Sequence, residues 1–226
     1  GKPQSGAIGG CVEAKLTRGE NLDIVAVIDF ETTGLSPAQG DRATEIAAVI
    51  IEDGQVVDRY QSLMNAGVRI PSFIESLTGI SNAMIRSVPP AAQVMREVAE
   101  FVGDIPLVAH NASFDSKFWD AELAHIKQRR RQEFACSLLL ARRILPLAPS
   151  HKLGDLVRFA NLPAGGRAHR ALADAEMAAS LLHHLEEQLC SRFQVKQVSH
   201  ELLRRIQSVP KAKLAQCLQQ YQNTQQ

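Results

Sequence analysis

The fold is decided near the start of the chain by the stretch Ile24-Val25-Ala26-Val27-Ile28-Asp29-Phe30-Glu31-Thr32-Thr33-Gly34. It opens with five apolar residues, four of them β-branched, a run typical of a strand buried on both faces. Because side chains alternate along a strand, the carboxylates of Asp29 and Glu31 face the same side. The sequence therefore predicts a central strand that ends in a pair of acids.

Further elements are expected on both sides of this strand. Strands over 44–52 and 56–64 are joined at Asp53-Gly54, a dipeptide favoured in tight hairpins because both positions tolerate positive φ. The first three strands are expected to form an antiparallel meander, and residues 105–109 a fourth strand. Apolar residues at helical spacing predict helices over 90–102, 113–126, 137–145, 152–160 and 170–189. Together these elements predict an α/β fold with a mixed sheet flanked by helices.

Two more acids follow buried elements. Asp115 ends the segment His110-Asn111-Ala112-Ser113-Phe114-Asp115, after the strand at 105–109, and Asp174 lies five residues after His169 at the front of the last predicted helix of the domain. Like charges at the end of a buried strand repel each other unless a cation compensates them. Four such carboxylates are the hard oxygen ligands that two Mg²⁺ or Mn²⁺ ions require for phosphoryl transfer.

The composition is that of a globular protein of 226 residues, 45% hydrophobic and 22% charged. No stretch approaches the roughly 20 consecutive apolar residues of a membrane helix and no secretory signal is visible, so we expect a cytoplasmic protein with no membrane partner. Four widely spaced cysteines without a CxxC pair indicate reduced thiols. A net charge of +1 disfavours a protein that binds polyanions over a large surface.

Three zones are expected along the chain: a flexible N-terminal arm at 1–22, a globular domain at 23–190 and a basic helical tail at 191–226. In the tail six basic residues face a single acid, Glu201, so it carries +5 and leaves −4 on the other 190 residues. Helices predicted over 199–208 and 210–221 form a C-terminal helical extension that packs on the domain or on a partner.

Three motifs stand in order along the chain: Asp29 through Gly34, His110 through Asp115, and His169 with Asp174. Together they resemble the exonuclease motifs of the DnaQ-like DEDDh superfamily. The resemblance covers about residues 24–189 and is closest to the proofreading exonucleases of bacterial replicative polymerases, such as the DNA polymerase III epsilon subunit. Residues 77–81, Leu-Thr-Gly-Ile-Ser, also resemble a segment of those enzymes near the bound 3′ end. The resemblance implies a ribonuclease H-like fold and makes 23–190 an exonuclease domain with 3′-to-5′ activity.

The resemblance also implies roles for individual residues. Asp29, Glu31, Asp115 and Asp174 would bind two metal ions, with Asp29 bridging both. His169 would be the general base, since an imidazole can take a proton from water near neutral pH.

A pocket for the terminal nucleotide is implied as well. Backbone groups of the turn Thr32-Thr33-Gly34-Leu35 would approach that nucleotide. The side chains expected to line the pocket are those of Phe30, Ile80, His110, Asn111 and Phe114.

Subfamily features favour the histidine type and DNA. A tyrosine-type relative would place Tyr four residues before the last Asp, where this chain has Arg170, so His169 is the candidate base. The double Thr of the first motif and the full His-Asn-Ala of the second differ from oligoribonuclease-like relatives, which favours DNA over RNA. RNase T-like enzymes share the style of the second motif, so RNA 3′-end trimming stays open.

Structural interpretations compete at several positions. His110 and Asn111 are suited to capping the following helix, a role compatible with substrate contact. Phe118 and Trp119 are interpreted as helix core rather than as a platform for stacking bases. Residues 127–131, Lys-Gln-Arg-Arg-Arg, are interpreted as a solvated charge run, with contact to a nucleic-acid backbone as the alternative.

Two hypotheses follow. The first is an active metal-dependent exonuclease that acts on DNA 3′ ends in proofreading or repair, and the second is a non-catalytic subunit of a polymerase assembly. All four carboxylates and the histidine are present, which favours the enzyme. A DNA polymerase and a sliding clamp are considered as partners. Residues 188–193 resemble clamp-docking peptides, but their spacing is imperfect and we attribute the likeness to chance.

Overall fold

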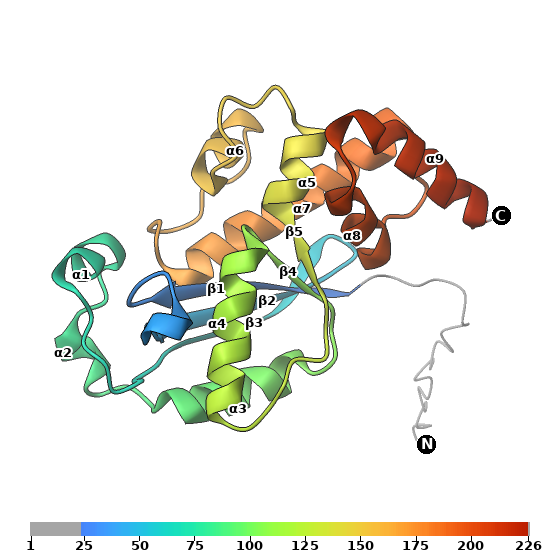
Figure 1. Ribbon diagram of the computed structural model, residues 1–226. Coiled ribbons are helices and arrows are strands. Elements are labelled where there is room, and N and C mark those ends of the chain that lie inside the picture. The colour runs from blue at the N-terminus through green and yellow to red at the C-terminus, as the bar shows by residue number, and fades with distance from the viewer. Residues whose placement is uncertain (1–23, 226) are drawn as a thin grey trace, which may run out of the picture.

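The computed structural model describes residues 24–225 (Figure 1). The predicted arm at 1–22 and Cys11 lie outside these residues. The strands are β1 (Val25–Thr32), β2 (Ala43–Glu52), β3 (Gln55–Leu63), β4 (Leu107–Ala109) and β5 (Phe134–Cys136). The α-helices are α1 (Ser72–Thr78), α2 (Asn82–Ile85), α3 (Ala91–Val102), α4 (Ala112–His125), α5 (Ser137–Ile144), α6 (Leu153–Phe159), α7 (Ala171–Phe193), α8 (His200–Ser208) and α9 (Leu214–Thr224), and two short 3₁₀ helices are η1 (Pro37–Gln39) and η2 (Lys211–Lys213).

The five strands form one sheet in the order β3-β2-β1-β4-β5. β1, β2 and β3 pair antiparallel, whereas β4 and β5 run parallel to β1. The hairpin between β2 and β3 turns at Asp53 and Gly54, whose φ angles of 51° and 71° are both positive. The predicted α/β fold, its mixed sheet and its antiparallel meander are therefore confirmed.

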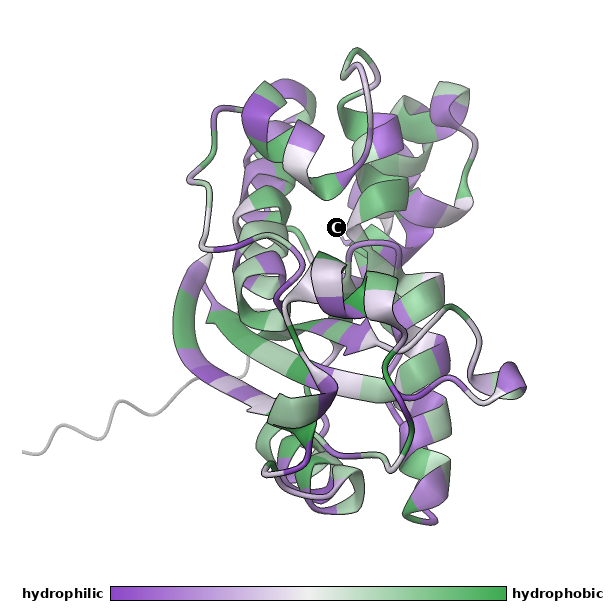
Figure 2. Ribbon diagram, turned by 90° about the vertical axis from the view of Figure 1, so that its left-hand side faces the viewer, coloured by the Kyte–Doolittle hydropathy of each residue, from purple (hydrophilic) through white to green (hydrophobic). Residues whose placement is uncertain are grey.

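The sheet is buried on both faces because β1 sends alternate side chains into two cores. Val25 and Val27 pack with α7 and α5 in one core, and Ala26 and Ile28 pack with α3 and α4 in the other. Figure 1 shows the sheet between α7 above and α3 below. In Figure 2 the helices alternate between hydrophilic and hydrophobic residues along their length, as expected where one face of each packs on the sheet. By this alternation Asp29 and Glu31 lie on the α7 side.

Several elements differ from the sequence-based expectation. β5, α1 and α2 are short elements that were not predicted from the sequence. β1 extends to Thr32 and contains both acids near its end, as expected, whereas α7 continues to Phe193, beyond the expected end at 189. Residues 188–193 are thus helical, and Leu189 is fully buried, so this segment is not free to dock as an extended peptide.

The basic tail packs on the domain, one of the two arrangements expected for it. Its apolar side chains share a core cluster with α5 and α7; they are Leu202, Leu203, Ile206, Leu214, Leu218 and Tyr221. Gln207 of α8 also satisfies the outer edge of β5, because its Oε1 accepts from the amide of Cys136 at 2.7 Å. The tail therefore covers an edge strand that would otherwise expose its backbone.

Two interpretations from the sequence are confirmed. The side chains of Phe118 and Trp119 are fully buried in the core between the sheet and α3. Residues 127–131 are mainly exposed. Arg130 forms an ion pair with Asp120 at 2.7 Å, and Arg131 forms a longer one with Asp104 at 3.7 Å. Cys136, Cys190 and Cys217 are free thiols. None of the helices within residues 24–225 is long and apolar enough to cross a membrane.

A substitution in the tail tests whether it belongs to the core. Leu202→Ala removes a side chain with no exposed surface, so we expect the free energy of unfolding to fall by about 2–5 kcal/mol in a urea titration. The matched control is Leu147→Ala, at a leucine that is 88% exposed, which should change it by less than about 0.5 kcal/mol. Equal, small effects of both substitutions would show that the tail is only loosely attached.

Candidate active site

Three carboxylates from two elements meet at the end of β1. Asp29 and Glu31 project from this strand toward α7, and Asp174 lies in the first turn of α7. One oxygen from each of the three lies within 4.8 Å of the others. The register of β1 against β2 shifts between Glu31 and Thr32, a bulge of the kind that redirects side chains beside active sites.

The fourth predicted acid reaches the same place from the other side of the sheet. Asp115 lies in the first turn of α4, is 3% exposed, and its Oδ1 accepts from the backbone amide of Phe30 at 3.2 Å. Phe30 stands between the two acids of β1, so this hydrogen bond fixes Asp115 beside them. The chain turns sharply before α4, because Asn111 has a left-handed φ of 67°. The structure thus brings all four predicted carboxylates together.

The grouped acids resist ionisation. Burial, followed by the charges of Asp115, Asp174 and Glu31, raises the pKa of Asp29 well above its usual range. Burial and the charge of Asp174 raise the pKa of Glu31 to about 8, and burial alone raises that of Asp115 to about 8. Burial also raises the pKa of Asp174, although His169 opposes the shift. Without a cation the cluster cannot be fully ionised at neutral pH.

The cluster fits a divalent cation. Oδ2 of Asp29 is buried, yet it has no hydrogen-bond partner among residues 24–225. A buried carboxylate oxygen without a partner costs free energy unless something else binds it. The donors here are carboxylate oxygens only, which are the ligands preferred by Mg²⁺ and Mn²⁺. Asp29, Glu31 and Asp174 would hold such an ion, with Asp115 next to them.

His169 lies at the rim of this cluster. Its side chain is exposed, and its φ of 61° is uncommon for a residue other than glycine. The conformation is stabilised by its own amide, which donates to Oδ2 of Asp174 at 3.1 Å. This bond ties the predicted base to a predicted metal ligand. A strained backbone held in this way is a common feature of functional sites.

The loop that carries His169 is anchored by a residue that the sequence analysis missed. Glu45 on β2 is fully buried and stands directly across from Glu31. Its carboxylate binds the guanidinium of Arg170 at 2.7 Å and accepts from the amide of Ala171 at 2.6 Å. Glu45 therefore fixes the start of α7, which positions Asp174. The available signal was a single acid within the apolar run at 43–51.

A second anchor lies on the other side of His169. The guanidinium of Arg167 packs against Gly79, at the end of α1, where a Cβ would collide with it. Gly79 also has a φ of 73°, a conformation that favours glycine. The loop is therefore held to β2 on one side of His169 and to α1 on the other.

Two residues predicted to line the nucleotide pocket are buried instead. Phe30 points to the opposite face of the sheet from Asp29, is 4% exposed, and packs its ring 6.2 Å from that of Trp119. Ile80 is fully buried in a small cluster with Ile70, among others. Their side chains have almost no accessible surface and contribute to packing, and their role in contacting a nucleotide stays a prediction. The period of two along β1 had already placed Phe30 on the other face.

The turn after β1 is built as a rigid loop. Thr32 Oγ1 donates to the carbonyl of Gly34 at 2.6 Å, and Thr33 Oγ1 lies 3.3 Å from Oδ1 of Asp41. The Asp41 carboxylate fills the space where a Cβ on Gly34 would lie. This packing leaves Leu35 at the tip, 77% exposed. The predicted turn is therefore preorganised, with an apolar side chain presented to solvent.

The remaining predicted residues lie at the start of α4. Asn111 is exposed and makes no side-chain cap bond to α4, and Phe114 is half-buried against Phe118 at 4.9 Å between ring centroids. His110 uses both ring nitrogens, on Ser137 Oγ and on the carbonyl of His151, each at 2.9 Å. The suggested capping role of the His110 and Asn111 side chains is thus not what the structure shows.

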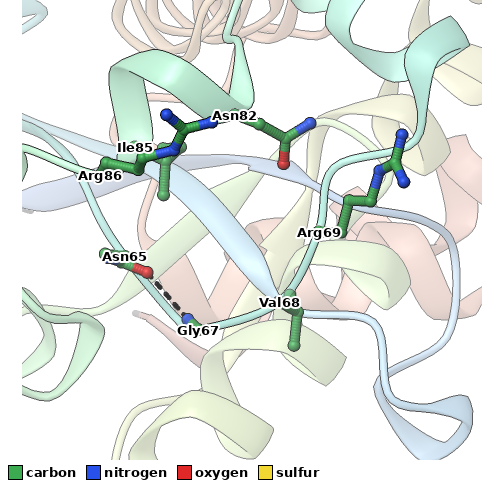
Figure 3. A pocket seen from close by; sticks show the side chains of 7 residues that line it. All are labelled: Asn65, Gly67, Val68, Arg69, Asn82, Ile85 and Arg86. Carbon is green, nitrogen blue, oxygen red and sulfur yellow. Dashed lines mark hydrogen bonds between the residues drawn. The ribbon is translucent and has the colours of Figure 1, made fainter.

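Two hollows in the surface were compared as places for a ligand. His110, Asn111, His169 and Asp174 contribute to one groove of about 700 Å³. A hollow of about 380 Å³ lies against the loop after β3 and α2, and Figure 3 shows its lining side chains, with Asn65 bonded to the amide of Gly67. No acid is among the residues that line this second hollow, so it offers no carboxylate to a cation.

Comparisons with known proteins agree with this geometry. A family model described as exonuclease matches residues 26–182. The chain is 38% identical over 170 residues to the 3′-5′ exonuclease DinG of Bacillus subtilis, covering 75% of this chain but only 18% of that protein. It is 33% identical to the DNA polymerase III subunit epsilon of Aquifex aeolicus, covering 74% of this chain and 82% of that one.

A solved structure is similar as well. Exonuclease X in complex with 5′-overhanging duplex DNA superposes with a TM-score of 0.65 at 26% identity, covering 81% of this chain and 99% of that one. The likeness confirms the ribonuclease H-like fold expected from the motifs.

The raised pKa values predict a pH-dependent stability in the absence of metal. Protonated Glu31 stabilises the fold below its unfolded pKa of 4.5, and this contribution is lost as pH rises through about 8. Glu31→Gln stays neutral, so in chelator its melting temperature should exceed that of the native protein by about 3 °C or more at pH 9, and by much less at pH 5.

Divalent metal supplies the control for this prediction. Adding Mg²⁺ at pH 9 should raise the melting temperature of the native protein more than that of Glu31→Gln, because the ion neutralises the ionised acids. Identical pH profiles of the two proteins in chelator, together with no effect of Mg²⁺, would contradict the grouping of charges described above.

Proposed function

Since the chain belongs to the exonuclease family, we propose that it removes nucleoside monophosphates one at a time from the 3′ ends of DNA, with two Mg²⁺ or Mn²⁺ ions as cofactors. The observation that carries this proposal is the convergence of Asp29, Glu31 and Asp174 within 4.8 Å, with one oxygen of Asp29 left without a partner in the described chain. An isolated binding subunit would have no need to keep so costly a cluster.

The carboxylates have distinct roles in the proposal. Asp29 has Glu31 and Asp174 on its own side of the sheet and Asp115 beside it, so these four carboxylates would hold the ions, with Asp29 at their centre. The ions, when bound, supply Lewis-acid chemistry at the scissile phosphodiester. The carboxylates keep the ions fixed relative to the β1 backbone, and Glu45 holds the helix that carries Asp174.

His169 accepts the proton of the attacking water. The hydrogen bond from the backbone amide of His169 to Asp174 keeps the imidazole close to the carboxylates. The side chain of His169 is exposed to solvent. A positioned base of this kind contributes about 10²–10⁴-fold to rate. Transfer of the proton to His169 leaves hydroxide to form the new P–O bond as the bond between phosphorus and the 3′ oxygen breaks. The released 3′ oxygen takes a proton from solvent water and becomes the 3′ hydroxyl of the shortened strand.

The preorganised turn holds the terminal nucleotide. Thr33 and Gly34 supply backbone groups, and exposed Leu35 with half-buried Phe114 supplies apolar contact for a base. Asn111, exposed at the start of α4, lies at the edge of the same site.

DNA is proposed as the substrate because of the relatives. The 33% identical epsilon subunit belongs to a DNA polymerase, and the 26% identical exonuclease X is bound to duplex DNA. The first likeness also supports association with a DNA polymerase in a proofreading or repair role. The chain spans less than a fifth of the DinG relative, so the activity of the whole protein is part of this proposal.

Release of 3′ nucleotides tests the function. Matched and 3′-mismatched DNA and single-stranded RNA are incubated with the protein in Mg²⁺, Mn²⁺ or chelator. We expect mononucleotide release from DNA that needs metal, with Asp29→Asn reducing the rate by at least about 10³-fold and His169→Ala by about 10²–10⁴-fold.

The matched control is Asp104→Asn, since this acid is 80% exposed and forms only a long ion pair with Arg131 at 3.7 Å. It should retain full activity. Faster release from RNA would move the role to RNA 3′-end trimming with the same chemistry. No release from any 3′ end by the folded, metal-supplied native protein would favour the non-catalytic subunit.

A further inference from the structure

A groove of about 700 Å³ adjoins the carboxylate cluster. His110 and Asn111 before α4, Ala168 and His169 before α7, and Asp174 and Met177 on α7 form part of its wall. The remainder comes from α5, from α6 and from the loop between them. It is therefore continuous with the site proposed for catalysis, but it lies on the side of His169 and α6 rather than on that of Leu35. It shares Asn111 with the site proposed for the terminal nucleotide and extends from there along α5 and α6.

The charges along the groove are mainly positive. Arg142 on α5, Lys152 before α6 and Arg158 on α6 are all exposed on its wall. Arg158 is paired with Asp155. Arg142 and Lys152 form no ion pair with any residue in the 24–225 range, although the charge of Lys152 helps to lower the pKa of Asp155.

The floor between these cations is held in place by hydrogen bonds. His110 is locked between Ser137 and the carbonyl of His151, and Nε2 of His151 in turn lies 3.0 Å from the carbonyl of Leu145. Apolar side chains complete the wall, including those of Leu153 and Met177. A groove with cations at its rim and an apolar floor matches a sugar-phosphate chain, whose charge lies on one side and whose sugars can pack on the other.

Cations in the groove would offset the repulsion between the acidic cluster and a nucleic acid. Four clustered acids repel a polyanion, and with a net charge of +1 the protein attracts nucleic acid only weakly as a whole. Cations beside the cluster overcome this locally. We propose that the groove binds the phosphodiester backbone of the nucleic acid beyond its terminal nucleotide, with Arg142 and Lys152 each neutralising one phosphate. This inference rests on the proposed exonuclease function.

The test removes both unpaired cations in Arg142→Ser/Lys152→Ser. For a single-stranded 20-nucleotide DNA we expect KM to rise about 25-fold, because each phosphate contact is worth about 5-fold at 0.1 M salt. The slope of log affinity against log salt should fall by about 1.4. Hydrolysis of the p-nitrophenyl ester of thymidine 5′-monophosphate, which fills only the terminal site, should be unchanged.

The matched control is Arg129→Ser/Arg131→Ser, which removes the same charge beyond the end of α4, and that end lies about 15 Å along the helix from Asp115. It should leave KM for the 20-nucleotide DNA unaltered. If both double variants raise KM equally, or if neither raises it on the single-stranded DNA or on a duplex with a recessed 3′ end, the groove proposal is wrong. Equal loss on the small ester would also overturn it, since the effect would then lie in the catalytic site.

The phosphodiester backbone in the groove could belong to the cleaved strand or to the complementary strand. A second substrate, a duplex with a recessed 3′ end, distinguishes these two. A KM effect on the single strand identifies the cleaved strand as the occupant, and an effect confined to the duplex identifies the complementary strand. Fluorescence anisotropy of the same DNAs in Mg²⁺ measures binding apart from turnover. The native protein could release no nucleotide while Arg142→Ser/Lys152→Ser, and not the control variant, loses affinity for DNA. That result would support binding in the groove and contradict the proposed exonuclease function.

Discussion

Repulsion among four carboxylates at the end of a buried strand is the constraint on which the rest of the structure depends. Folding brings Asp29, Glu31 and Asp174 within 4.8 Å and leaves an oxygen of Asp29 buried without a partner in the described chain. Such an arrangement is unfavourable unless a cation joins it. A bound divalent ion relieves this repulsion, so the free energy that destabilises the cluster without a cation contributes to the affinity for the ion.

The fold offsets part of this cost with its helices. α4 and α7 both begin at the cluster, and the positive ends of their dipoles favour the acids in their first turns, Asp115 and Asp174. The backbone amide of Phe30 donates a hydrogen bond to Asp115, and the backbone amide of His169 donates one to Asp174. Two long helices packed on opposite faces of the sheet therefore deliver acids to one strand end, which explains why a mixed sheet with β1 at its centre suits this site.

The sequence predicts what is local and misses what is not. The apolar run before Asp29, the turn at Asp53 and Gly54, and the acid in the first turn of α7 each follow from a short pattern, and all appear in the structure. The pair between Glu45 and Arg170 joins residues 125 positions apart, so no local period reveals it. Phe30 was assigned to the pocket from resemblance alone, although the alternation along its own strand places it in the core.

The central claim is that the cluster around Asp29 is a two-metal site. Crystals grown with Mn²⁺ and thymidine 5′-monophosphate, measured at the manganese absorption edge, test it most directly. The account predicts two anomalous peaks at the carboxylates, both in contact with Asp29, and their loss in crystals of Asp29→Asn. A native crystal with manganese peaks only elsewhere on the protein, and none at Asp29, would contradict it.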